Sequence, residues 1–122
     1  MTLRTGLLLL PSRRVHELAE LAARAEALGY EDVWLADERF FREVYAALAV
    51  CAQRTTRVRL GPCVTDPYTR HPALTAMAIA TLDEIAGGRA ALGLGAGVSG
   101  LRELGIDGSR SATAIRDRKS VV

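Results

Sequence analysis

Short apolar runs alternate with helical patterns along this chain. Four compact apolar segments suit buried strands: residues 3–10, 32–36, 57–61 and 90–95. Three segments between them repeat apolar residues every three or four positions, as amphipathic helices do: residues 13–28, 42–53 and 72–85. The predicted order is β-α-β-α-β-α-β, in about four βα units. Because the strands are continuously apolar rather than alternating, we expect a parallel α/β sheet with both faces covered.

Two architectures share this pattern. One is the N-terminal half of a (β/α)8 TIM barrel, which needs about 250 residues when complete. The other is a small doubly wound sheet, and hydrophobic periodicity alone does not distinguish the two. Both place their sites at the carboxyl ends of the strands, so the segments that follow each apolar run are the candidates for function.

The helical patterns predict which side chains pack on the sheet. Each helix has one apolar face: Val15, Leu18, Ala22 and Ala25 on the first, Val44, Ala47, Leu48 and Cys51 on the second, and Leu74, Met77, Ala78, Thr81, Leu82 and Ile85 on the third. We expect all three faces to be buried.

Composition excludes several classes of function. The formal net charge is +2 and the basic residues are scattered, which does not favour nucleic-acid binding. The first apolar run ends at Pro11, too soon for a signal peptide or a membrane span. Cys51 and Cys63 match no metal-ligand spacing, and we expect them to be reduced. The expectation is a cytoplasmic protein without metal, nucleic-acid or membrane partners.

The C-terminal residues differ in character from the rest. Lys119 is the single lysine beside 15 arginines, and residues 117–122 interrupt a helix that starts near Ser111. We interpret residues 1–116 as a truncated barrel domain and residues 117–122 as a non-native tail. A genuine polar tail is the alternative.

A glycine-rich motif follows the fourth predicted strand. Residues 95–100 match G-x-G-x-x-G, but a dinucleotide site also needs a full helix and an acidic residue about twenty positions on. The nearest candidate for that acid is Asp117, with no strand before it. Glycines that permit a tight turn, or a loop that lets the main chain approach a cofactor, are the alternatives.

The exit of the third predicted strand combines groups that suit a flat ring. Such a ring needs an apolar platform and a few polar groups at its edge. Val64 would supply the platform, and Thr65 with nearby main-chain groups would supply the edge. The plainer interpretation is an ordinary turn before a helix, in which Asp66 accepts local backbone hydrogen bonds.

Residues 61–97 resemble a known family. Gly-Pro-Cys-Val-Thr-Asp-Pro-Tyr-Thr-Arg-His-Pro at 61–72, the following helix, and Gly-Arg-Ala-Ala-Leu-Gly-Leu-Gly-Ala-Gly at 88–97 look like strand 3 to strand 4 of the luciferase-like monooxygenase superfamily. The resemblance covers residues 3–116. It looks closest to the methylenetetrahydromethanopterin-reductase-like branch. It implies half of a (β/α)8 barrel that transfers a hydride between the deazaflavin coenzyme F-420, or FMN, and a small organic substrate, and it implies a homodimer.

The resemblance also suggests site residues. It implies a non-prolyl cis peptide, Cys63–Val64, that bulges the third strand against the cofactor ring. By position, the resemblance also implies that the cofactor is contacted by Asp37, Thr65, Gly95, Gly97 and Val98. For Asp37, capping the second helix or pairing with Arg39 is the alternative.

This chain departs from the family at two positions. Many relatives have His where it has Glu38, and many have an acid near Val98. No catalytic acid or base is therefore assigned.

Two other functions remain open from sequence. A half barrel leaves sheet edges and apolar faces uncovered, so the chain could be a catalytically incompetent fragment. The glycine motif alternatively suggests a small nicotinamide dinucleotide-binding unit.

Overall fold

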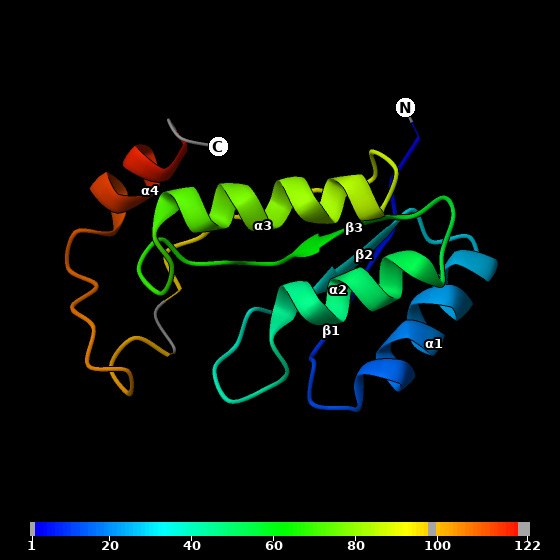
Figure 1. Ribbon diagram of the computed structural model, residues 1–122, viewed down its shortest axis with the longest axis horizontal. Coiled ribbons are helices and arrows are strands. Elements are labelled where there is room, and N and C mark those ends of the chain that lie inside the picture. Colours follow the sequence, from blue (N-terminus) through cyan, green and yellow to red (C-terminus); the bar gives the residue numbers. More distant parts are fainter. Residues whose placement is uncertain (1, 98–99, 120–122) are drawn as a thin grey trace.

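The computed structural model describes residues 2–97 and 100–119 (Figure 1). Its elements follow the predicted order as far as the third helix: β1 (Gly6–Leu9), α1 (Val15–Ala27), β2 (Asp32–Leu35), α2 (Val44–Gln53), β3 (Arg59–Pro62) and α3 (Pro72–Ile85). The next element is a helix, α4 (Ser111–Lys119), and not the predicted fourth strand. Helix α3 begins and ends at its predicted residues, and the strands are shorter than their apolar runs. In the described ranges, no helix combines the length and apolar character that a membrane crossing requires.

The three strands form one parallel sheet in the order β1-β2-β3. Leu7 lies opposite Val33, and Val33 lies opposite Leu60. Figure 1 shows α1, α2 and α3 as one layer over the same side of these strands. A doubly wound sheet reverses its strand order and carries helices on both faces. The observed arrangement is that of a barrel segment, which decides between the two architectures.

The core lies between this helix layer and the sheet. The predicted faces of α1 and α2 are confirmed except at Val15, which is half-buried, since residues such as Leu18, Ala22, Leu48 and Cys51 are buried. They pack with strand residues such as Leu60. Burying one such leucine is worth about 1.5–3 kcal/mol relative to leaving it in water.

The other face of the sheet is open in this chain. Leu8 and Leu10 are 55% and 56% exposed, and Leu3, before β1, is 83% exposed. The expectation that both faces are covered is therefore wrong for these residues, because all three helices of the layer lie on one side.

The apolar face of α3 is also largely exposed. Leu82 is buried as predicted, but Leu74 and Met77 are 54% and 64% exposed. Helix α3 packs on α2 at one border of the layer. The expectation of a fully buried face is wrong because no further helix covers the outer side of α3 among the described residues.

The fourth predicted strand is a paired segment rather than a regular strand. Residues 90–94 run parallel to β3 through two isolated bridges, Leu60 with Ala90 and Thr65 with Leu94. Between the bridges, the β3 side has one more residue than its partner, which is the count of a β-bulge. The bulge interrupts the ladder and so explains the missing fourth strand.

Arg89 joins the ends of two helices to the sheet. Its guanidinium donates to acceptors at the end of α2, before β3 and after α3: the carbonyls of Ala52, Thr55, Val58 and Ala86 and the hydroxyl of Thr55, at 2.7–3.0 Å. Carbonyls at helix ends have no partner inside the helix, so one side chain satisfies several of them.

We expect Arg89→Ala to lower the free energy of unfolding by about 2–3 kcal/mol, because carbonyls at the ends of α2 and α3 lose a charged donor. Arg89→Lys should recover only part of this, since an ammonium cannot reproduce the planar fork. Urea unfolding measures the effect, and the exposed Arg13→Ala is the control. Equal midpoints for Arg89→Ala and Arg13→Ala would contradict the assignment.

An ion cluster joins the starts of β2 and β3. The buried carboxylate of Asp32 accepts hydrogen bonds from Arg59 at 2.6 Å and from Arg4 at 3.3 Å. Burial alone raises the pKa of Asp32, but the two guanidinium groups outweigh it, so the pKa lies below its ordinary value of 3.8.

A lowered carboxyl pKa stabilises the fold above pH 3.8 and loses this contribution as the pH falls through the folded-state pKa. We therefore expect Asp32→Asn to be less stable than the wild type at neutral pH and to lose less stability on acidification. Urea unfolding at neutral pH and at about pH 2.5 tests this. Parallel losses in both proteins would rule out Asp32 as a source of the pH dependence.

Candidate functional site

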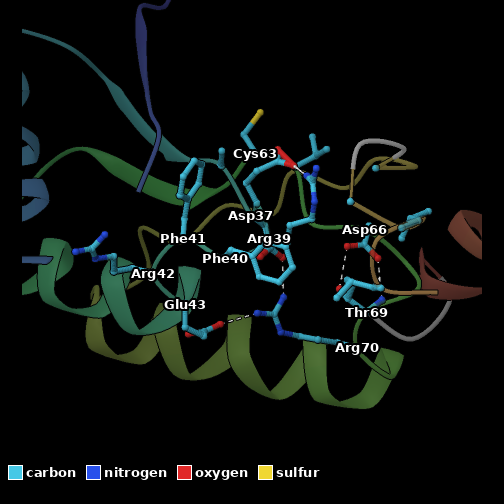
Figure 2. A pocket seen from close by; sticks show the side chains of 17 residues that line it. Asp37, Arg39, Phe40, Phe41, Arg42, Glu43, Cys63, Asp66, Thr69 and Arg70 are labelled. Carbon is cyan, nitrogen blue, oxygen red and sulfur yellow. Dashed lines mark hydrogen bonds and ion pairs between the residues drawn. The ribbon is translucent and has the colours of Figure 1, made fainter. Parts of the chain in front are cut away.

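A cavity of about 540 Å³ opens at the carboxyl ends of the strands. This volume lies within the range of about 300–1,000 Å³ that is usual for small-molecule sites. Its walls come from the β2 exit, the bulged β3 exit, the turn before α3 and the segment after residue 95 (Figure 2). Parallel strands bring their carboxyl ends to one edge, which is why these distant segments meet.

The predicted site residues divide into two groups. Asp37, Cys63, Val64 and Gly97 line the cavity. Thr65 is fully buried and, like Gly95, is outside the lining. Val98 lies outside the described residues.

The bulge presents Val64 to the cavity. The Cys63–Val64 peptide is cis, as the resemblance implied. The Val64 side chain is 39% exposed at the cavity wall. A Cβ on Gly95 would lie 2.6 Å from Val64 Cγ2, so Gly95 leaves the room in which this side chain sits.

The main chain beside the bulge is equally close-packed. A Cβ on Gly61 would lie 1.8 Å from the carbonyl oxygen of Ala91, and one on Gly93 would lie 2.5 Å from that of Pro62. No real Cβ contact is that short, so only glycine permits these two segments to approach as they do.

Asp37 is held by groups from the β3 exit. Its Oδ2 accepts hydrogen bonds from the Thr65 hydroxyl at 2.7 Å and from Arg70 Nη1 at 2.6 Å. It therefore makes neither of the contacts that we considered as alternatives. Glu43, not Asp37, caps α2 by accepting from Ala46 N at 2.8 Å. Arg39 pairs with Glu38 and Glu103.

Arg70 links this carboxylate to the helix layer. Its Nη2 donates to Glu43 Oε1 at 2.5 Å, and its guanidinium carbon lies 4.9 Å from the centre of the Tyr45 ring. Burial disfavours the charge of Arg70, but Asp37 and Glu43 outweigh it and raise the pKa of Arg70. Burial also raises the pKa of the Tyr45 phenol. Arg70 is therefore a fixed cation between two carboxylates.

The local interpretation of Asp66 is confirmed. Its Oδ1 accepts from the backbone N–H groups of Tyr68 and Thr69 at 2.7 and 2.8 Å. His71 then caps the start of α3, with Nδ1 accepting from Ala73 N at 3.2 Å. These contacts fix the turn that carries Arg70 into the cavity wall.

Several lining residues were not predicted from sequence. They are mostly charged or aromatic: Glu38, Arg39, Phe40, Phe41, Arg42, Glu43, Asp66, Thr69 and Arg70. Arg70 lies in the motif that carries the family resemblance, but its partners are 27 and 33 positions away. Sequence spacing gives no signal for such contacts.

Several carboxylates line the cavity, but the described residues do not form a metal-binding cluster. Within residues 2–97 and 100–119, no three His, Cys, Asp or Glu side chains gather as metal ligands. Cys51 and Cys63 are free thiols, as predicted.

The dinucleotide interpretation of the glycine motif has no structural basis. A pyrophosphate site needs a helix directly after the motif. Residues 100–105 form turns instead, and α4 begins only at Ser111. Asp117 lies within α4 rather than at the end of a strand.

We expect Thr65→Val to destabilise the site and the fold by about 1–3 kcal/mol, because the half-buried Asp37 carboxylate loses a donor while the volume is kept. Thr65→Ser retains the hydroxyl and serves as the matched control. Chemical unfolding of the three proteins tests this. If Ser and Val destabilise equally, the hydrogen bond to Asp37 does not carry the effect.

Comparisons with known proteins agree with this geometry. The chain is 47% identical over 92 residues to 5,10-methylenetetrahydromethanopterin reductase of Methanolobus tindarius, which covers 75% of this chain and 28% of that protein. It is 36% identical over 101 residues to the F-420-dependent glucose-6-phosphate dehydrogenase of Amycolatopsis mediterranei, covering 75% of this chain and 30% of that enzyme. The chain thus spans under a third of the length of either relative.

A solved structure contains the fold of nearly all of this chain. The coenzyme F-420-dependent tetrahydromethanopterin reductase of Methanopyrus kandleri superposes with a TM-score of 0.89 at 37% identity, covering 95% of this chain and 38% of that one. The family model described as luciferase-like monooxygenase matches residues 2–113. This match covers most of the chain, so the chain belongs to the luciferase-like monooxygenase family.

Proposed function

We propose that the protein containing this chain transfers a hydride between a deazaflavin or flavin and a small organic substrate. One observation carries the proposal. The bulged β3 main chain presents Val64 as an exposed apolar surface inside a cavity of ligand size. Relatives named for F-420-dependent oxidoreductases share this part of the fold.

The residues present fit a planar ring. Val64 gives an apolar contact on one wall, and Leu104, which is 44% exposed, adds apolar surface to the same cavity. Asp37, Glu43 and Arg70 supply charged groups along another wall. A flat heterocycle with polar edges needs both kinds of surface, since its faces are apolar and its nitrogen and oxygen atoms require partners.

We assign roles to this chain's residues accordingly. Val64 and the Cys63 main chain support the ring face, Gly95 leaves room for Val64, and Gly97 lets the main chain approach the ring. Thr65 orients Asp37 from behind, because its hydroxyl proton is used in the bond to Oδ2. The bound cofactor supplies the hydride chemistry, and the protein positions it and excludes water.

Our choice of cofactor rests on the relatives rather than on the site. The three similar proteins described above include two that are named for F-420. We therefore propose F-420, with FMN as the alternative.

A homodimer is also part of the proposal. An apolar groove of about 320 Å³ runs over α2 and α3, lined by residues such as Ala49, Leu74, Met77 and Ile85. A second copy of the protein that covers this groove would bury side chains that are now exposed.

We expect the chain to bind F-420 or FMN and Val64→Asp to lose most of this affinity, because a carboxylate would replace the apolar contact with the ring. Val64→Ile keeps an apolar surface and is the control. Quenching of cofactor fluorescence on titration measures binding. Because the ring contact is local, we expect Val64→Asp to weaken binding at least about tenfold, and Val64→Ile by less than about threefold.

The same titration separates the remaining alternatives. Tight stoichiometric binding by the monomeric chain would defeat the fragment alternative. No binding of either cofactor by a folded chain, with protection by NAD instead, would contradict the proposal.

A further inference from the structure

The loop after β2 holds an aromatic residue in a backbone conformation that suits glycine. Phe40 has a φ of +64°, and every other positive φ in the described ranges belongs to glycine. Phe41 N donates to the Glu38 carbonyl at 3.4 Å, so residues 38–41 form a turn with Phe40 at its third position. Turns with positive φ there favour Gly or Asn. A bulky aromatic side chain at this position is an outlier.

Packing within the chain does not account for this residue. The Phe40 side chain is 82% exposed. It lines the same cavity as Phe41 and Val64, which are each 39% exposed (Figure 2). An unfavourable backbone conformation therefore places an uncovered aromatic ring at the candidate site. Such conformations gather at functional sites because the surrounding structure must hold them in place.

Contacts with two other segments hold the turn. After it, Arg42 N donates to the Pro11 carbonyl at 3.2 Å, and Arg42 Nη1 donates to the Ser12 carbonyl at 2.8 Å. Within the turn, Arg39 pairs with Glu38 at 2.7 Å, and it also pairs with Glu103 outside the turn. The turn is thus tied to the β1 exit and to the segment after residue 100. Phe40 is displayed by a fixed turn rather than by a free loop.

We propose that Phe40 is a specificity-determining residue whose ring packs against a flat aromatic heterocycle bound in the cavity. An aromatic ring pairs favourably with another through offset stacking or edge-to-face contact. The adjacent Glu38, Arg39 and Arg42 also line the cavity and match the polar edge of a nitrogen heterocycle. The inference rests on the proposed function. The heterocycle is either the ring of the redox cofactor or a flat ring of the second reactant.

Phe40→Gly separates a ligand contact from a structural role. Glycine adopts positive φ without strain, so this variant should melt at or above the wild-type temperature. It should nevertheless bind flat heterocycles about tenfold more weakly, because the aromatic contact is gone. Phe40→Tyr restores the ring and should bind within about twofold of the wild type. Leu3→Ala, at a site that is 83% exposed and outside the cavity lining, is the control.

Four probes distinguish the source of the ring: F-420, FMN, lumiflavin, which has the tricyclic ring without the phosphate tail, and pterin. Weaker binding of F-420, FMN and lumiflavin to Phe40→Gly identifies the cofactor ring as the contact. Unchanged cofactor affinity with weaker pterin binding to the cofactor-loaded chain identifies the second reactant. Fluorescence titration measures each affinity.

The remaining outcomes count against one proposal or both. The inference is overturned if Phe40→Gly binds every probe within about twofold of the wild type. It is also overturned if this variant loses stability and binding together, as a structural role predicts. If the wild-type chain binds lumiflavin or pterin through Phe40 but neither F-420 nor FMN, the proposed function fails and the inference stands. If none of the four probes binds the wild-type chain, both the inference and the proposed function are overturned.

Discussion

The main chain of residues 59–65 forms hydrogen bonds to a neighbour on each side, and the rest of the site depends on this double pairing. On one side, Cys63 N donates to the Leu35 carbonyl at 2.8 Å. On the other, Thr65 N donates to the Gly93 carbonyl at 2.9 Å. The extra residue between the two bridges with residues 90–94 is pushed out of the ladder as a bulge. Val64 reaches the cavity because of it, and Thr65 returns to the interior.

Charge pairing then fixes the site to the helix layer. Asp37 comes from the β2 exit, Thr65 from the β3 exit, Arg70 from the turn before α3, and Glu43 from the cap of α2. Each member has at least one partner from another segment, so a shift of one element would leave a charge or a buried hydroxyl unpaired. Unpaired polar groups of this kind are costly, which makes the arrangement rigid. Phe40 stands outside this network, on a turn that is anchored separately.

Local patterns were sufficient to predict the elements and part of the site. The periodicity of α1 and α2 identified their buried faces, and the proline at residue 72 marked the first residue of α3. The same periodicity was misleading for α3, because an apolar face says nothing of whether a neighbouring element covers it. The fourth predicted strand shows a similar limit. An apolar run signals burial, but the bulge that interrupts its pairing arises from the register between two segments.

The sequence by itself determined the alternation of strands and helices, the strand exits as the place for a site, and the residues that carry the family resemblance. These are local properties, set by side-chain periodicity, turn residues and a contiguous motif. The tertiary structure decided the sequential strand order of the sheet, the partners of Asp37, and the positions of Arg70 and Phe40 in the cavity wall. Those features depend on contacts between residues about thirty positions apart. Such contacts exist only once parallel pairing has brought the carboxyl ends of the strands to one edge.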